Sequence, residues 1–363
     1  MSTELRYALP VDQTNWVVNG ETETVLRWEY DDGRDSLLTL YDKGKKGQWD
    51  AADRIDWSQN LDPENPMLLP ENRIAIYGTP MWDKLNNKEK ANFRRHAQAW
   101  NISQFLHGEQ GALICTAKIV QQVPNMDSKF YAATQVIDEA RHVEAYSRLL
   151  HEKFELAYPI TPPLKALLND VIADSRWDFT YLGMQVLIEG LALAAFQGIR
   201  TDSRNPLAAS VNAYVMQDEA RHVAFGRLAL RDYYPQLTQH ERDIREEFVV
   251  EGCYHMRDRF LSEELWDATG LPKKECMDHV THSESMQVFR RFLFARIVPI
   301  VKDIGLWGPK VQKAFTDMGV IAFSALDSSA MMAQDEEIAR AFDEGRGTYV
   351  VPEETSFQFG TAD

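Results

Sequence analysis

The hexapeptide DEARHV occurs twice in this 363-residue chain, at residues 138–143 and again at residues 218–223. Each copy has a glutamate upstream inside an apolar run: Glu109 in FLHGEQGALI and Glu189 in QVLIEGLALA. The pattern E-x29-E-x-x-H is therefore present twice, and the two copies stand 80 residues apart. An internal repeat of this kind indicates that one structural unit is built twice.

The positions of the helix breaks explain the spacing within each copy. Glu109 lies fifteen residues before Pro124, and Glu139 lies twelve residues after Asp127, which can cap a new helix. At ~1.5 Å per residue the chain would descend roughly 22 Å and return roughly 18 Å, so an antiparallel pair places both carboxylates at one level. The second copy has the same layout around Pro206. Two such pairs predict a four-helix bundle with the repeated residues in its core.

The rest of the chain predicts an all-α protein. Long helical stretches are expected at residues 87–123, 127–157, 175–200, 206–234, 238–266 and 283–304, with no β-hairpin signals between them. We expect a four-helix bundle with additional C-terminal helices and an irregular N-terminal segment. The expected parts are an N-terminal segment packed on the bundle (1–86), the bundle (87–235), further helices of the same domain (236–344) and a flexible tail (345–363).

The composition excludes several classes of protein. The 55 acidic and 39 basic residues give a net charge of −16, which argues against binding nucleic acid or anionic membranes through bulk charge. The three cysteines form no CxxC pair, which argues against a disulfide scaffold, a zinc ribbon or a rubredoxin-type site. The N-terminus lacks a signal-peptide pattern, and the longest apolar stretch, 182–196, is too short to span a bilayer. We therefore expect a soluble, cytoplasmic protein.

The repeated residues suit a metal site. Within each ExxH the Glu and the His are i, i+3 neighbours on one helix face, and four carboxylates with two imidazoles suit a pair of iron or manganese ions. A single ExxH is common, and a lone Glu in an apolar helix can be a satisfied polar group. Burying several unpaired carboxylates, however, would cost several kcal/mol each, and cations remove this cost. The shared spacing therefore predicts a site for two metal ions.

Over residues 87 to 235, these motifs resemble the ferritin-like di-iron carboxylate proteins. The resemblance implies two iron ions, with manganese or a mixed Mn/Fe pair as the alternative. It implies six ligands, three from each copy: Glu109, Glu139 and His142, and Glu189, Glu219 and His222.

The residues around each ExxH predict a supporting layer for the metal site. Asp138 and Asp218 stand four residues before a histidine and can accept a hydrogen bond from an imidazole N–H, while Arg141 and Arg221 can neutralise them. The alternative is an Asp–Arg pair on the surface. The DExRH arrangement resembles the hydroxylase subunits of bacterial multicomponent monooxygenases, and Gln135 resembles a pocket-lining residue of that family. Trp49 has no partner at a matching spacing and is interpreted as structural.

Small residues are frequent around Glu109 and Glu189. They could leave an apolar cavity for a substrate, or they could allow close helix packing, and both interpretations stay open. The small residues are Gly108, Gly111, Ala112, Gly190, Ala192, Ala194 and Ala195.

Four positions bear on the choice within the superfamily. Leu193 stands where the monooxygenase hydroxylases have a pocket threonine, and Val215 stands where the arylamine N-oxygenases have a seventh ligand, a histidine. Tyr146, four residues after His142, has the position of the radical tyrosine in ribonucleotide reductase small subunits, and Tyr349 in the tail also resembles that family. A hydrogen bond from Tyr146 to a ligand is the other interpretation.

The resemblance implies an oxygenase that uses O2 to hydroxylate or otherwise oxidise a small organic substrate, such as an amine, an aromatic ring or a carrier-bound intermediate. Tyr146 and Gln135 would lie beside the reacting groups. The chain has no flavin or nicotinamide fingerprint, so we expect a reductase or ferredoxin to donate electrons. A homodimer is compatible with the pattern. The alternatives are a tyrosyl-radical-generating subunit and a non-catalytic iron-binding ferritin-like protein.

Overall fold

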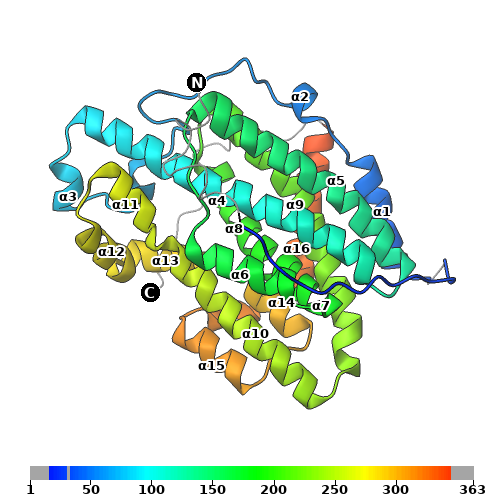
Figure 1. Ribbon diagram of the computed structural model, residues 1–363. Coiled ribbons are helices and arrows are strands. Elements are labelled where there is room, and N and C mark those ends of the chain that lie inside the picture. The colour runs from blue at the N-terminus through cyan, green and yellow to red at the C-terminus, as the bar shows by residue number, and fades with distance from the viewer. Residues whose placement is uncertain (1–15, 31–32, 345–363) are drawn as a thin grey trace.

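The computed structural model describes residues 16–30 and 33–344, which fold into helices without a β-strand (Figure 1). The predicted all-α class is confirmed. The predicted flexible tail, residues 345–363, lies outside the described residues, and so does Tyr349. The boundaries proposed between the N-terminal segment, the bundle and the additional helices stay a prediction.

Four long helices form the centre of the fold as two pairs of neighbours (Figure 1). The first pair is α4 (Asn87–Gln122) and α5 (Met126–Arg148). The second pair is α8 (Glu189–Asp202) and α9 (Pro206–Tyr233). Because α5 also packs against α9, the two pairs form one bundle, as the repeat predicts.

The caps of the bundle helices follow the sequence with one exception. Asn205 caps α9 as predicted, since its side chain accepts the backbone N–H of Ala208 at 3.1 Å. The predicted cap at Asp127 is wrong, because α5 begins one residue earlier and Asn125 caps it. Asp127 lies in the first turn instead, where its carboxylate accepts the backbone N–H of Arg34 at 3.0 Å.

The third helix of the bundle contains a wide turn directly before Glu189. The chain is helical from Trp177 to Asp202, but Leu182–Ile188 (η5) is a π-helix between α7 (Trp177–Tyr181) and α8. A π-helical segment changes the direction in which the following side chains point, and such segments are frequent at functional sites. This helix is long and apolar enough to cross a membrane, but 94% of its apolar window is buried inside the protein. It is therefore a core helix of the fold.

The helix α6 (Pro162–Ala173) was not predicted. The sequence YPITPP reads as a helix stop, but two of its prolines occupy the first turn of α6, where no N–H needs an intrahelical partner. The helix packs against α4 and α10.

The remaining helices surround the bundle. The capping box of Thr238 and Glu241 begins α10, as predicted, but α10 ends at Asp258 rather than near residue 266 because the chain turns at Ser262, where φ is +53°. The predicted stretch 283–304 is two helices. The N-terminal helices are α1 (Asp35–Lys46), α2 (Ala51–Arg54) and α3 (Pro80–Asp83). The C-terminal helices are α10 (Gln239–Asp258), α11 (Glu263–Thr269), α12 (Lys273–His282), α13 (Glu284–Phe292), α14 (Ile297–Asp303), α15 (Pro309–Asp317) and α16 (Ser328–Asp343).

Candidate metal centre

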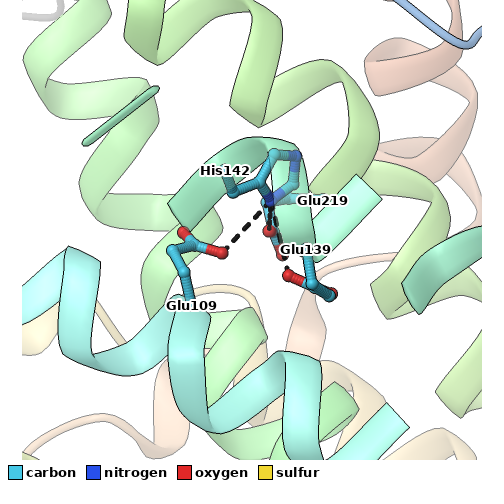
Figure 2. Close-up of side chains that lie close together, drawn as sticks. All are labelled: Glu109, Glu139, His142 and Glu219. Atoms are coloured by element: carbon cyan, nitrogen blue, oxygen red, sulfur yellow. Dashed lines mark hydrogen bonds and ion pairs between the residues drawn. The ribbon is translucent and has the colours of Figure 1, made fainter. Parts of the chain in front are cut away.

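The fold brings all six predicted ligands to one place in the bundle core. Helix α4 supplies Glu109, the first residue of α8 is Glu189, and the two ExxH pairs come from α5 and α9. All six side chains are buried, and Glu109 is the most exposed of them at 5%. Their donor atoms form two groups, each with its atoms within 4.8 Å of one another. The first group is Glu109, Glu139, His142 and Glu219 (Figure 2), and the second is Glu139, Glu189 and His222.

The two ExxH glutamates lie between the two imidazoles. The Nδ1 atom of His142 is 3.4 Å from Glu139 Oε2 and 3.2 Å from Glu219 Oε1. The Nδ1 atom of His222 is 3.1 Å from Glu139 Oε1 and 3.6 Å from Glu219 Oε2. Each of these carboxylates thus turns one oxygen to each histidine and links the two halves of the cluster. Glu109, with Oε2 at 3.1 Å from His142 Nδ1, lies at one end of the cluster.

Several polar atoms of the cluster have no hydrogen-bond partner although they are buried. They are the Oε2 atoms of Glu139, Glu189 and Glu219. Buried polar atoms are rarely left without a partner, because each costs about 1–3 kcal/mol of desolvation. Oxygen and nitrogen donors in this ratio are typical of iron and manganese sites, and two divalent cations would satisfy the unpartnered atoms. The residues therefore fit a pair of metal ions.

Protons take the place of cations when the cluster holds no metal. Burial, and secondarily the Glu219 carboxylate, raise the pKa of Glu109 to about 8, and burial also raises the pKa of Glu189 well above its ordinary value. Burial alone would lower the pKa values of His142 and His222, but the facing carboxylates raise both well above the ordinary value. Cations entering the cluster at neutral pH must therefore displace protons.

The two aspartates of the repeat accept hydrogen bonds from the imidazoles crosswise. The Nε2 atom of His142 donates to Asp218 at 3.1 Å, and the Nε2 atom of His222 donates to Asp138 at 3.3 Å. Each bond joins the two copies of the repeat. The Nδ1 atom of each ring faces the glutamates of the cluster, and Nε2, on the far side of the ring, points toward the aspartate of the opposite helix. The bond from Nε2 holds each ring with Nδ1 toward the carboxylates, so that Nδ1 is the atom that would bind a metal ion once its proton is displaced.

The arginines of the repeat pair with these aspartates inside the protein. Arg141 contacts Asp138 at 2.5 Å and Asp218 at 3.1 Å, and Arg221 forms an ion pair with Asp218. Both aspartates are 0% exposed, which excludes the alternative of an Asp–Arg pair on the surface. The four side chains form one network that holds both imidazoles.

Two residues outside the repeat complete this network, and the sequence pattern did not identify them. Gln48 Nε2 donates to Asp138 Oδ1 at 2.8 Å, and Trp49 Nε1 donates to Asp218 Oδ2 at 2.8 Å. The guanidinium of Arg141 also lies 5.1 Å from the centre of the Trp49 ring. Both residues belong to the link between α1 and α2, so the N-terminal segment supports the site directly. Trp49 is structural, as expected, but it has a specific partner in the site.

Gln135 and Tyr146 differ in their relation to the cluster. The amide nitrogen of Gln135 donates to Glu139 Oε1 at 2.8 Å and to Glu189 Oε1 at 2.9 Å, so Gln135 joins two carboxylates of the second group. The hydroxyl of Tyr146 donates to Asn212 Oδ1 at 3.1 Å, which is not one of the six predicted ligands. Gln135 is therefore better placed than Tyr146 to control the geometry of the carboxylates.

The small residues near the cluster have different surroundings. A Cβ atom on Gly111 would lie 2.5 Å from Leu168 Cδ2, and one on Gly190 would lie 3.1 Å from Ile297. These glycines allow close helix packing. A Cβ atom on Gly108, by contrast, would meet no atom within 4 Å, so open space lies beside Gly108 itself. The apolar substrate cavity stays a prediction.

A comparison with protein families identifies the chain. The model of the family "P-aminobenzoate N-oxygenase AurF" matches residues 31–305. The chain belongs to this family. The match includes the six cluster residues, the aspartates and arginines around them, and the link that carries Gln48 and Trp49. A search of curated proteins found no match.

The family match confirms the predicted superfamily and the predicted chemistry. The protein is a non-heme di-iron oxygenase, an O2-dependent oxidoreductase that acts on a small organic substrate, with two iron ions as its cofactor. Within the superfamily, the match is to the N-oxygenases of aromatic amines rather than to the monooxygenase hydroxylases, which the motifs resemble more closely. Val215, where a seventh ligand would stand, is 0% exposed and carries no donor atom, so the site has six candidate ligands.

Proposed function

We propose that this protein oxidises the nitrogen atom of a small aromatic amine. The proposal rests on the family match over residues 31–305, because the family carries the description of a p-aminobenzoate N-oxygenase. The buried cluster of four glutamates and two histidines is compatible with this chemistry. A substrate panel distinguishes aromatic amines from the other candidate substrates, which are small aromatic compounds and other amines.

We propose that Glu109, Glu139, His142 and Glu219 would hold one metal ion and that Glu139, Glu189 and His222 would hold the other. The short distances from the Glu139 and Glu219 carboxylates to both Nδ1 atoms support a shared role for these two residues. When bound, the two iron ions would supply the reduction of O2 and the transfer of oxygen to the substrate.

The chain itself contributes position and exclusion of water. Gln135 holds the Glu139 and Glu189 carboxylates together, and the crosswise bonds hold both imidazoles with Nδ1 toward the metals. We place Gln135 beside the reacting groups on this ground. The burial of the whole cluster keeps bulk water away from the reacting atoms.

The two electrons for each turnover come from another protein in this proposal. We propose a reductase or ferredoxin as the donor. A cytoplasmic location and a homodimer are also part of the proposal.

Metal analysis combined with a substrate panel tests the function. The purified chain should bind two iron ions and, with reductant, consume O2 in step with conversion of an arylamine to its hydroxylamine, nitroso or nitro product. The same ring without an amino group should give no product. If the protein converted only the ring that lacks an amino group, its activity would be ring hydroxylation, and the proposed N-oxygenation would be wrong.

The ligand assignment has its own test and control. Glu139→Ala and His222→Ala should each lose stoichiometric iron, because each removes a donor that no neighbour replaces. Glu144→Ala, which changes an exposed residue on the helix that carries Glu139, should keep both ions. If either ligand variant retained two ions per chain, the assignment would be wrong.

Neither alternative function has an observation in its favour. A radical-generating subunit predicts a tyrosyl signal in electron paramagnetic resonance that Tyr146→Phe abolishes. A non-catalytic iron store predicts uptake far beyond two ions per chain. Aerobic iron loading of the same protein tests both.

A further inference from the structure

Arg259 differs from the other buried arginines of the protein. In the described part of the chain six arginines are buried, and five of them form an ion pair with an aspartate. The five are Arg141, Arg221, Arg227, Arg245 and Arg296. Arg259 is only 7% exposed, but it has neither an ion pair nor a hydrogen bond among the described residues, and its Nε atom is buried without a partner. A guanidinium in this position lacks the counter-ion that the other five have.

The missing counter-ion makes the burial of Arg259 unfavourable. Burial lowers the pKa of this side chain to about 10, so it is still a cation at neutral pH. Removing a charged group from water is costly unless an opposite charge and hydrogen bonds replace the water. The N–H donors of a guanidinium form a planar fork that fits a carboxylate or a phosphate. The unpaired Arg259 therefore indicates an anionic ligand.

Helices α6 and α10 determine where this ligand would lie. They are side by side and run in opposite directions (Figure 1). A Cβ atom on Gly252 of α10 would lie 3.4 Å from Leu167 of α6. One turn further along α6, Val171 lies beside Gly183 together with Phe248, which is one turn further back in α10. The end of α10 is therefore beside the start of α6.

Arg259 comes level with the first turn of α6. It directly follows α10 in the 3₁₀-helix η7 (Arg259–Leu261), which packs against α6. Arg259 is seven residues after Gly252, and Thr161 is six residues before Leu167. Both are thus displaced by about 10 Å in the same direction from the contact between those two residues. Arg259 and the start of α6 are therefore neighbours.

The start of α6 also favours an anion. Thr161 is the N-cap of this helix, but its side chain makes no capping bond, and its Oγ1 atom is buried without a partner. The N-terminus of a helix carries a partial positive charge, which attracts an anion and repels a cation such as Arg259. An anion that contacts both groups would remove this repulsion and satisfy both unpartnered atoms.

We propose that Arg259 and the start of α6 bind a small oxyanion, either the carboxylate of an organic acid or a phosphate group. The guanidinium donates two parallel hydrogen bonds to the oxyanion, and the hydroxyl of Thr161 donates a third. Neither residue belongs to the candidate metal centre, and the proposal depends neither on iron nor on the proposed substrate.

The oxyanion site nevertheless adjoins a helix of the metal centre. Gln104 of α4 accepts the backbone N–H of Thr161 at 2.9 Å and donates to the carbonyl of Pro159 at 2.9 Å. Gln104 stands five residues before Glu109, which is about 7.5 Å along the helix axis. A bound anion would therefore hold the start of α6 beside the helix that carries Glu109.

Isothermal titration calorimetry of the full chain at pH 7 and constant ionic strength tests the proposal with two probes, sodium benzoate and inorganic phosphate. At least one probe should bind the unchanged protein. Arg259→Met should raise its dissociation constant about 10- to 100-fold, because the variant removes hydrogen bonds between charged groups. Binding at the metal ions would remain in this variant, so the two sites can be distinguished. The probe with the lower dissociation constant at the Arg259 site identifies the group that the site takes.

Arg257→Met is the matched control for the loss of charge. Arg257 is two residues before Arg259, but its side chain is 41% exposed and pairs with Asp258 at 2.7 Å, so this variant should keep the affinity of the unchanged protein. Thr161→Val should raise the dissociation constant about 3- to 10-fold, which corresponds to one neutral hydrogen bond. Thr161→Val also replaces Arg259→Met if methionine prevents folding.

Thermal melts distinguish a binding site from an arginine that is buried for structural reasons alone. Without added anion, Arg259→Met should melt at or above the temperature of the unchanged protein, because methionine removes an unpaired charge. Benzoate or phosphate should then raise the melting temperature of the unchanged protein but not that of the variant. The proposal is overturned if neither probe binds, if both bind Arg259→Met as tightly as the unchanged protein, or if Arg257→Met causes the same loss.

Discussion

Replacing Asp218 with asparagine should weaken its interaction with His142, 76 residues away in the sequence, more than any interaction with His222, four residues away. The expectation follows from the crosswise bonds, in which each aspartate accepts from the imidazole of the other copy. Asparagine has the same size and keeps an acceptor oxygen, so the change removes the charge and little else.

The coupling energy between Asp218 and His142 in the metal-free protein follows from the charges and the burial of the two side chains. The facing carboxylates raise the pKa of His142 well above its ordinary value, although burial opposes this, so the ring is an imidazolium at neutral pH. A hydrogen bond to a charged group contributes about 1.5–3 kcal/mol, and both partners are 0% exposed, so water does not screen it. We expect a coupling energy of about this size between Asp218→Asn and His142→Gln. The coupling of Asp218→Asn with His222→Gln should be smaller by about 1 kcal/mol or more, since those two side chains interact only through the arginine network.

Urea unfolding of the chelator-treated protein at pH 7 measures both couplings. Circular dichroism and tryptophan fluorescence must give the same transition, so that each variant has a defined free energy of unfolding. The mirror pair, Asp138→Asn with His222→Gln, should repeat the result. A larger coupling of Asp218 with His222 than with His142 would show that the bonds run within each copy and that the crosswise network is incorrect.

Three further outcomes follow from the geometry of the site. Gly111→Ala should destabilise the protein by about 1–3 kcal/mol in urea unfolding, because its Cβ would overlap a leucine of α6, whereas Gly108→Ala should be neutral or stabilise by up to ~1 kcal/mol. The melting temperature of the metal-free protein should fall as the pH rises from about 4.5 toward 8, because Glu109, with a folded-state pKa of about 8, binds its proton more tightly when folded. Glu109→Gln should reduce this fall, and an unchanged pH profile would contradict the assignment. Trp49→Phe removes the donor to a buried carboxylate and should weaken metal binding about 10-fold in a metal titration. Trp57→Phe, which removes a bond to a backbone carbonyl, should not.

The positions of the six cluster residues could be predicted because the E-x29-E-x-x-H pattern occurs twice in the sequence. Glu109 and Glu189 recur at one spacing from their ExxH pairs, and helix geometry converts that spacing into a common level in the bundle. The all-α class follows from the same periodicity. Gln135 was also predictable, since it precedes Glu139 by one helical turn and reaches the same carboxylate.

Other features could not be predicted because they depend on contacts between distant segments. Gln48 and Trp49 lie 90 and 169 residues from the aspartates that they contact, and no spacing rule links them. The π-helix Leu182–Ile188 has an ordinary apolar composition, and only its packing between neighbouring helices reveals the wide turn. The prolines at the start of α6 were misread because proline both ends one helix and begins the next.

The two halves of the repeat keep the same ligands but differ in what surrounds them. The aspartate beside His142 receives an indole N–H from Trp49, whereas the aspartate beside His222 receives an amide N–H from Gln48. Tyr146 stands four residues after His142, but the matching residue after His222 is Gly226, where a Cβ would lie 2.4 Å from Gln185 Cβ. A side chain cannot be added there without moving a helix. Tyr146 therefore has no counterpart at the matching position after His222, so the two halves of the cluster have chemically different surroundings although both carry the ExxH pair and the upstream glutamate.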